Sequence, residues 1–401
     1  MNTQELINEE KRYIMQTYNR FPVVFTKGKG VKLIGLDGKE YLDFISGIGV
    51  NTLGHSFPKI VFAIRNQISK LSHTSNLYYT IPQIKLAKML GELTGLDKCF
   101  FANSGAEANE GAIKLARKYS KENIGQDKYE IITAYNSFHG RTFGALTATG
   151  QEKFHKGFEP LLPGFKYVKF NDLDDLRKAI SDNTCAVMLE PIQGEGGVSV
   201  PAPNYFKEVR KICDEKNLLL ILDEIQTGLG RTGKMFAFEH YGIKPDILTL
   251  AKGIGGGLPL GVMIAVDKVA SNFIYGSHAS TFGGGPVVCS AAVAVLNVLR
   301  KEKILDNVNE VGKYFLNRLL KLKEKYDFIK DVRGIGLMLG LELNLSGKEI
   351  VKKLFEHCIL INCTNETVLR FLPPLIITKK DVDKVVNTLD EVLTDENNRI
   401  K

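Results

Sequence analysis

The stretch LLLILDEIQTGLGRTG, residues 218–233, followed by KPDILTLAKGIGGGLPLG, residues 244–261, decides the fold. Each half contains an apolar run too short for a helix, which is typical of a buried parallel strand. The first run ends at Asp223 and Glu224, and the second ends just before Lys252 and a glycine-rich turn. Because ligands of open α/β sheets bind at the carboxyl ends of the strands, we expect an acid and an amine to meet there.

Asp223 and Lys252 together favour one cofactor. A lysine in a poorly solvated, glycine-lined corner loses its proton readily, and the neutral amine can attack a carbonyl. Pyridoxal phosphate needs such a lysine for its aldehyde and a carboxylate for its pyridine nitrogen, so the pair predicts this cofactor. For the isolated pair an alternative stays open, in which Asp223 caps a helix and Lys252 is a solvated loop charge.

Strand and helix patterns alternate on the N-terminal side of this stretch. Short apolar runs at 99–102, 129–135, 166–170 and 185–189 are separated by amphipathic segments such as 203–216. This order predicts an α/β domain with a mostly parallel, doubly wound sheet, which we place at residues 46–285. Residues 1–45 are expected to join a smaller α+β domain formed by residues 286–401.

An anion site is expected where CFFANSGAEANE, residues 99–110, passes from strand to helix. The amides of the first helical turn have no partners within the helix, and Gly105 lets a ligand approach closely. A phosphate is therefore expected beside Gly105 and Ala106. The alternative is an ordinary strand-to-helix turn that binds nothing.

The segment NSFHGRT, residues 136–142, follows another predicted strand. Phe138 could stack on a flat cofactor, and Arg141 could bind a carboxylate through two parallel hydrogen bonds. The alternative is a core Phe beside a surface Arg. Ser280 and Thr281 precede three glycines and could contact a phosphate, or could simply fill a loop.

Composition argues against several functions. The net charge of +8 comes from scattered residues, so nucleic-acid binding is not expected. Six cysteines without a C-x-x-C pair indicate free thiols in a reducing compartment, and the seven histidines show no metal-binding spacing. The polar N-terminus is not expected to be a signal peptide, and no apolar run approaches the roughly 18 residues of a membrane helix. We expect a cytoplasmic protein that binds neither metal nor membrane.

Three motifs carry a resemblance to a known family: NSGAEANE at 103–110, LLLILDEIQTGLGRTG at 218–233 and LAKGIGGGLPLG at 250–261. They resemble the class III (ornithine-type) aminotransferases, pyridoxal phosphate enzymes of fold type I. The resemblance runs from about Gly28 to Leu393. The segments SNLYYT, FHGRT, EPIQGEGG and VLRFLPPLIIT are most similar to members that take N-acetylornithine as amino donor.

The resemblance implies an enzyme of arginine biosynthesis. It would move the δ-amino group of N-acetyl-L-ornithine to 2-oxoglutarate, giving N-acetyl-L-glutamate 5-semialdehyde and L-glutamate, by a ping-pong route through pyridoxamine phosphate. Ornithine, 4-aminobutyrate and succinyl-diaminopimelate stay open as alternative donors. A non-catalytic binding protein of the same fold is a more remote alternative.

The resemblance also implies residue roles. Lys252 would bond the cofactor aldehyde and then move a proton, while Asp223 pairs with the ring nitrogen. The other expected cofactor contacts are Gly105, Ala106, Phe138, Glu224, Ile225, Gln226 and, across a homodimer interface, Thr281 of the partner subunit. Arg141, with the partner subunit's Ser280 nearby, would bind the donor's α-carboxylate. Arg370 would be held by Glu195 until glutamate arrives.

Overall fold

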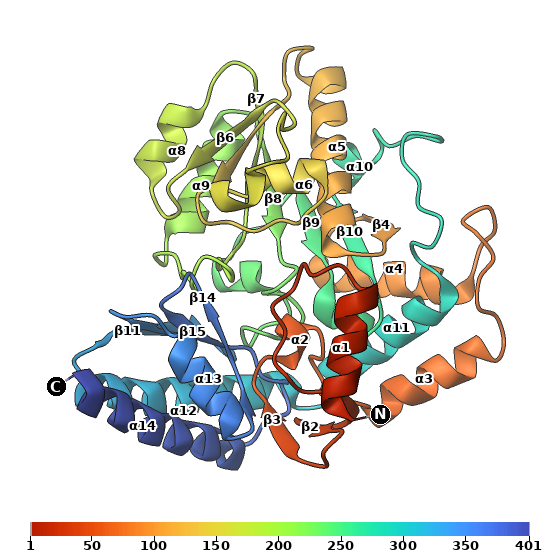
Figure 1. The fold of residues 1–401 in the computed structure, drawn as a ribbon. Coiled ribbons are helices and arrows are strands. Elements are labelled where there is room, and N and C mark those ends of the chain that lie inside the picture. The colour runs from red at the N-terminus through yellow and green to blue at the C-terminus, as the bar shows by residue number, and fades with distance from the viewer. Residues whose placement is uncertain (1, 401) are drawn as a thin grey trace.

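The chain, in a computed structural model that describes residues 2–400, forms three sheets (Figure 1). The largest has seven strands in the order β4-β10-β9-β8-β7-β5-β6. The neighbours from β9 to β6 are parallel, whereas β10 runs antiparallel to both β9 and β4. The strands are β4 (Lys98–Ala102), β5 (Glu130–Ala134), β6 (Phe165–Val168), β7 (Thr184–Leu189), β8 (Leu219–Asp223), β9 (Ile247–Leu250) and β10 (Gly261–Ala265).

The reversal of β10 follows from the length of its connection. Residues 251–260 separate β9 from β10, whereas a crossover to a parallel strand needs about a dozen residues or more. The predicted sheet, parallel for the most part, is confirmed with this one exception.

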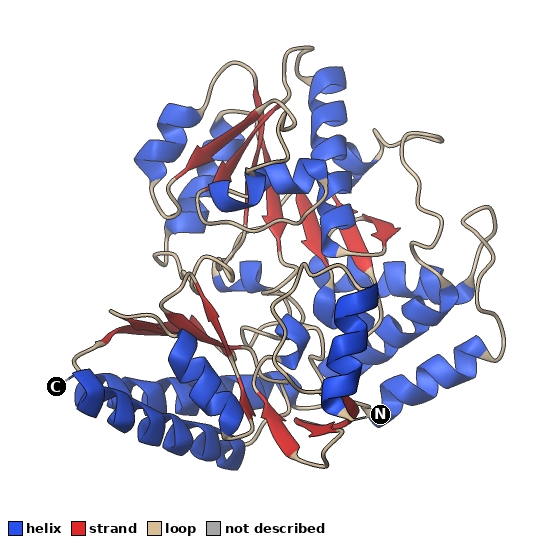
Figure 2. Ribbon diagram, in the orientation of Figure 1, coloured by secondary structure: helices blue, strands red, loops and turns tan. Residues whose placement is uncertain are grey.

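Helices cover both faces of the large sheet (Figure 2). Alternate residues of β8 enter two separate apolar clusters: Leu220 and Leu222 pack with α9 (Tyr205–Glu215), and Leu219 and Ile221 pack with α5 (Gly105–Asn123). Because both faces are buried, the strand sequences are continuously apolar. The doubly wound prediction is therefore confirmed. The other helices of this region are α2 (Ser46–Gly49), α3 (Pro58–Ile68), α4 (Ile81–Thr94), α6 (Phe143–Ala148), α7 (Glu152–His155), α8 (Leu173–Ala179), α10 (Asp267–Ala270) and α11 (Pro286–Lys301).

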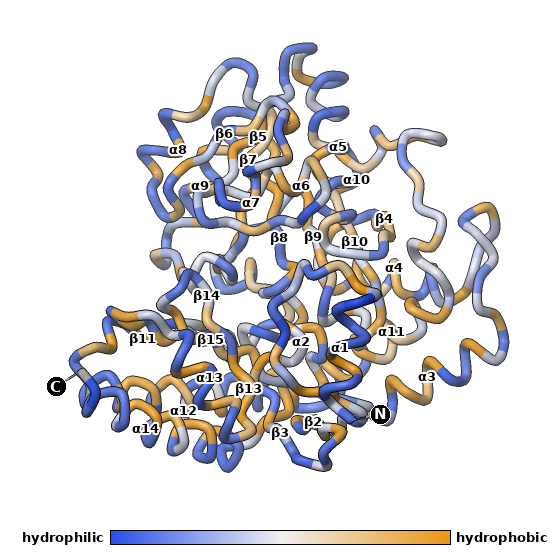
Figure 3. Tube along the Cα trace, viewed as in Figure 1, coloured by the Kyte–Doolittle hydropathy of each residue, from blue (hydrophilic) through white to orange (hydrophobic). Residues whose placement is uncertain are grey.

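The C-terminal region forms a second sheet covered by helices. Its strands lie in the order β11-β12-β15-β14, and α12 and α14 alternate between polar and apolar residues, as Figure 3 shows. The bounds are α12 (Ile304–Lys325), β11 (Ile329–Ile335), β12 (Met338–Leu343), α13 (Lys348–Glu356), β14 (Asn362–Thr364), β15 (Val368–Phe371) and α14 (Lys379–Ile400).

The third sheet joins the two ends of the chain. It contains β1 (Phe25–Lys29), β2 (Lys32–Gly35) and β3 (Glu40–Asp43), which follow α1 (Thr3–Tyr13), and β3 pairs in parallel with β13 (Ile359–Leu360). This pairing supports a small domain that draws on both chain ends, although the boundaries at 45 and 285 stay predictions. Across residues 2–400, no helix combines the length and apolarity needed to span a membrane.

Candidate active site

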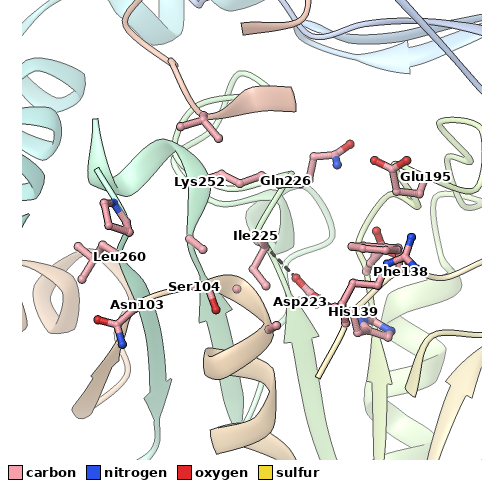
Figure 4. A pocket seen from close by; sticks show the side chains of 18 of the residues that line it. Asn103, Ser104, Phe138, His139, Glu195, Asp223, Ile225, Gln226, Lys252 and Leu260 are labelled. Carbon is pink, nitrogen blue, oxygen red and sulfur yellow. Dashed lines mark hydrogen bonds and ion pairs between the residues drawn. The ribbon is translucent and has the colours of Figure 1, made fainter. Parts of the chain in front are cut away.

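A cavity of about 550 Å³ opens where β7, β8 and β9 end, a volume suited to a small molecule. Figure 4 shows Lys252 and Gln226 extending into it, with Asp223, Phe138 and His139 along one side. The lining includes nine residues predicted from the sequence: Gly105, Ala106, Phe138, Arg141, Glu195, Asp223, Ile225, Gln226 and Lys252. The expected meeting of Asp223 and Lys252 follows from the pairing of β8 with β9.

Asp223 is buried at the end of β8 and is held by three donors. Its Oδ2 accepts hydrogen bonds from Asn109 Nδ2 at 2.7 Å and from His139 Nδ1 at 2.8 Å, and its Oδ1 accepts one from the Ile225 amide at 3.0 Å. Burial alone would lower the pKa of His139, but the bond to Asp223 and its charge raise that pKa above its ordinary value. The histidine, the asparagine and the amide thus fix the orientation of the Asp223 carboxylate.

The sequence reasoning assigned no role to His139 or Asn109. A signal for Asn109 was available, because it lies four residues after Gly105 in a helix and therefore shares its face. His139 lies in the same short segment as Phe138 and Arg141, but its bond to Asp223 spans 84 residues of sequence.

Lys252 follows β9 in a left-handed backbone conformation, with φ of 46°. Such a conformation is strained for a residue with a side chain, and strain of this kind gathers at functional sites. The next residue, Gly253, has no room for a side chain, since a Cβ there would lie 2.2 Å from Thr52 Oγ1. Burial lowers the pKa of Lys252, the charge of Arg370 adds to this effect, and nearby carboxylates oppose it. The result is a strand-end amine that gives up its proton more easily than a solvated lysine.

The start of α5 has the free amides that the expected anion site requires. Ser104 caps the helix by accepting a hydrogen bond from the Glu107 amide, while the amides of Gly105 and Ala106 find no acceptor within residues 2–400. A Cβ at Gly105 would lie 2.7 Å from Ile225 Cδ1, so this turn packs closely against the loop after β8. Two free amides at a helix N-terminus suit a phosphate.

Arg370 on β15 is 1% exposed and contacts Glu195, which lines the cavity. Its Nη1 donates to Glu195 Oε1 at 2.6 Å and to Gln226 Oε1 at 3.4 Å, and its Nε donates to Asn362 Oδ1 at 3.2 Å. Burial raises the pKa of Glu195, but the charge and hydrogen bond of Arg370 outweigh burial and lower it. Arg370 Nη2 is buried without a partner among the described residues, so the guanidinium keeps one free donor edge.

Four predicted residues are absent from the lining: Arg370, described above, and Glu224, Ser280 and Thr281. The Glu224 carboxylate accepts hydrogen bonds from the amides of Ala237 and Phe238 at 2.7 and 2.8 Å, and it thereby anchors the loop after β8. Successive side chains of a strand point to opposite faces, so Glu224 turns away when Asp223 faces the cavity. Ser280 Oγ accepts a hydrogen bond from Asn103 Nδ2 at the cavity edge, and Thr281 lies beyond it. Their expected action from a partner subunit stays a prediction.

The residues present fit pyridoxal phosphate. A carboxylate held by three donors suits a protonated ring nitrogen, the amine of lowered pKa suits an aldehyde, and the two free amides suit a phosphate. On a doubly wound sheet this set defines a pyridoxal phosphate enzyme of fold type I.

Comparison with known proteins identifies the family. Residues 13–393 match the family described as aminotransferase class-III, and the chain belongs to it. The chain is 57% identical over 395 residues to the acetylornithine aminotransferase of Methanocaldococcus jannaschii, covering 98% of this chain and 99% of that protein. The predicted family is confirmed.

Solved structures give the same result for the fold. The ornithine aminotransferase of Toxoplasma gondii ME49 matches with a TM-score of 0.96 at 35% identity, covering 100% of this chain and 96% of that chain. The acetylornithine aminotransferase of Elizabethkingia anophelis matches with a TM-score of 0.89 at 34% identity, covering 98% and 100%. A second structure of the Toxoplasma gondii ornithine aminotransferase shows partial occupancy of pyridoxal phosphate at its active site. Class-III aminotransferases use this cofactor, and so does the present enzyme.

Proposed function

We propose that this enzyme transfers the δ-amino group of N-acetyl-L-ornithine to 2-oxoglutarate, as a step of arginine biosynthesis. The products are N-acetyl-L-glutamate 5-semialdehyde and L-glutamate. The observation that carries the proposal is the identity of 57% and 55%, over nearly full length, to two proteins named acetylornithine aminotransferase. The solved structures do not separate the donors, because an ornithine and an acetylornithine aminotransferase match at 35% and 34% identity.

Pyridoxal phosphate, when bound, supplies an aldehyde for the amino group and a ring that withdraws electrons from the reacting carbon. We propose that Asp223 keeps a proton on the ring nitrogen, helped by His139 and Asn109. The amides of Gly105 and Ala106 hold the phosphate, Phe138 covers the ring, and Gln226 lies near the ring hydroxyl. Lys252 Nζ, whose pKa burial lowers, accepts a proton from the substrate carbon and returns it.

Two arginines answer a problem of substrate geometry. The reacting amine of acetylornithine is remote from its α-carboxylate, whereas that of glutamate is adjacent to it. We propose that Arg141 binds the remote carboxylate, and that Arg370 binds the adjacent one only when Glu195 releases it. The direct Arg370–Glu195 ion pair and the free Nη2 of Arg370 support this assignment.

We also propose a cytoplasmic homodimer with shared active sites. Exposed aromatic side chains lie on the two loops that Asn76 and Ser280 join by a hydrogen bond, with Tyr79 at 94% and Phe282 at 65% exposure, and a second copy would cover them. In that dimer Ser280 and Thr281 reach the neighbouring cavity. Six free cysteines are in keeping with a reducing compartment.

Steady-state kinetics with 2-oxoglutarate as acceptor tests the donor. We expect kcat/KM for N-acetylornithine to exceed that for ornithine, 4-aminobutyrate and succinyl-diaminopimelate, each measured on the same preparation. Lys252→Ala serves as the control for background transamination. A higher kcat/KM for any of the other donors would replace acetylornithine in the proposal.

A further inference from the structure

Arg141 lines the cavity without any polar partner. Within residues 2–400 it makes neither a hydrogen bond nor an ion pair, and its side chain is exposed. Its guanidinium carbon instead lies 3.9 Å from the centroid of the Phe154 ring and 5.6 Å from that of Phe138. Aromatic rings therefore contact this guanidinium, and its hydrogen-bonding edge stays available for an anion.

Phe154 can fix another side chain because hydrogen bonds and a ring contact hold its own segment. It lies on α7, where the neighbouring His155 Nε2 bonds the carbonyls of Leu146 at 2.9 Å and Thr149 at 2.7 Å. The Phe154 ring also meets the Phe138 ring edge-on, with centroids 6.0 Å apart and planes at 84°. The ring that contacts Arg141 is thus anchored to the segment that carries Phe138.

The loop that carries Arg141 is also held in place. Gly140 has φ of 142°, and a Cβ there would lie 2.6 Å from the Ala106 Cβ at the start of α5. Beyond Arg141, the amides of Gly144 and Ala145 donate to Glu110 Oε1 at 2.7 and 3.0 Å. The backbone is therefore fixed on both sides, and the long side chain of Arg141 is the part whose orientation remains to be set.

We propose that Phe154 is a positioning residue, which holds the Arg141 guanidinium in the orientation that binds a carboxylate remote from the reacting amine. An arginine without this ring contact would lose rotamer freedom each time it bound a substrate. Because Phe154 already orders the side chain in the free enzyme, substrate binding costs less conformational entropy. The flat ring also fixes the guanidinium plane, which bidentate binding of a carboxylate requires. The proposal rests on the function proposed above for Arg141.

Phe154→Leu tests the proposal because leucine keeps an apolar side chain but removes the aromatic face. From the usual strength of cation–π contacts we expect a roughly three- to twentyfold rise in KM for N-acetylornithine, with kcat nearly unchanged. Phe154→Tyr keeps the face and should restore the wild-type KM. Phe158→Leu, at an exposed phenylalanine four residues away, is the matched control and should have no effect.

Two ligands separate positioning from general damage to the fold. N-acetyl-1,4-diaminobutane has the same acyl group and reacting amine but no carboxylate, so kcat/KM for it should be equal in Phe154→Leu and wild type. N-acetyl-L-norvaline keeps the carboxylate and lacks the amine, so calorimetry on the holoenzyme should show its Kd rising by the same factor as the KM. An unchanged Kd in Phe154→Leu, or an equal loss for donors with and without a carboxylate, would overturn the proposal.

These measurements also test the role of Phe154 separately from the identity of the donor. Wild-type donor preference reports on acetylornithine, whereas the ratio of Phe154→Leu to wild type reports on Phe154 for whichever carboxylate-bearing donor the enzyme uses. If acetylornithine fails as donor and the ratio for that other donor still rises, only the proposed donor is wrong.

Discussion

The guanidinium groups of Arg370 and Arg141 are held by different kinds of contact. Arg370 is 1% exposed on β15 and has a counter-ion, Glu195, at 2.6 Å. Arg141 is exposed on a loop and has an aromatic ring at 3.9 Å in place of an acid. A guanidinium shut off from water needs an opposite charge, whereas a hydrated one needs only to be oriented.

This difference suits the two proposed duties. A cation that must be inactive toward one substrate can be controlled by a counter-ion that holds or releases it. A cation that meets a remote carboxylate in both half-reactions gains nothing from a counter-ion, which would only compete with the substrate. Substitutions at Arg370 and at Arg141 should therefore have different effects on the two half-reactions.

The largest expected effect comes from removing either guanidinium. Arg370→Ala should slow the glutamate half-reaction roughly 100-fold, because a buried, charge-assisted contact to the α-carboxylate is worth about 3 kcal/mol. The acetylornithine half-reaction should change less than about fivefold, since Arg370 is then paired with Glu195. Arg141→Ala should instead weaken both half-reactions. Single-turnover absorbance measurements with each substrate alone separate these patterns.

If Arg370→Ala slowed both half-reactions equally, the proposed difference in role between Arg370 and Arg141 would be wrong. The melting temperature of each variant serves as the control, because a general loss of folding would lower activity toward both substrates together.

A smaller effect should follow from freeing Arg370 without removing it. In Glu195→Ala the buried guanidinium loses its counter-ion and is available in both half-reactions. We expect the ratio of kcat/KM for acetylornithine to that for glutamate to fall about fivefold, which corresponds to roughly 1 kcal/mol. Glu366→Gln, at an exposed acid, is the control. An unchanged ratio would mean that Glu195 does not govern Arg370.

Sequence patterns were sufficient to predict the parts of this site that lie at strand ends. Continuous apolar runs located β8 and β9, and strand pairing then brought Asp223 and Lys252 together. A role for Glu224 beside the cofactor stays a prediction; its carboxylate accepts hydrogen bonds from the amides of Ala237 and Phe238, and the alternation of side chains along a strand lets only one of two successive acids face the cavity.

The remaining contacts depend on tertiary geometry that no local pattern encodes. Asn109 reaches Asp223 across 114 residues, and α7, which carries Phe154, has only four residues and no usable periodicity. The stacking of Phe154 on Arg141 therefore could not be anticipated from spacing. The ion pair of Arg370 with Glu195 spans 175 residues and was expected only through the family resemblance.

The smallest expected effect is a pH dependence of the melting temperature that comes from the ion pair between Arg370 and Glu195. The pKa of Glu195 lies below its ordinary value of 4.5 in the folded protein, because the charge and hydrogen bond of Arg370 outweigh the effect of burial. The unfolded chain therefore binds this proton more readily, and the stability due to the pair is present above pH 4.5 and is lost as the pH falls through the lowered pKa. The melting temperature of wild type should thus approach that of Glu195→Gln by on the order of 1 °C between pH 6 and pH 3, in a chain this long. Glu9→Gln, at an exposed acid without an ion pair among residues 2–400, should show a constant difference over the same range. The Arg141 guanidinium has no ion pair with an acid among residues 2–400, so a matching dependence in Arg141→Gln would show that the two arginines do not differ in the way their contacts indicate.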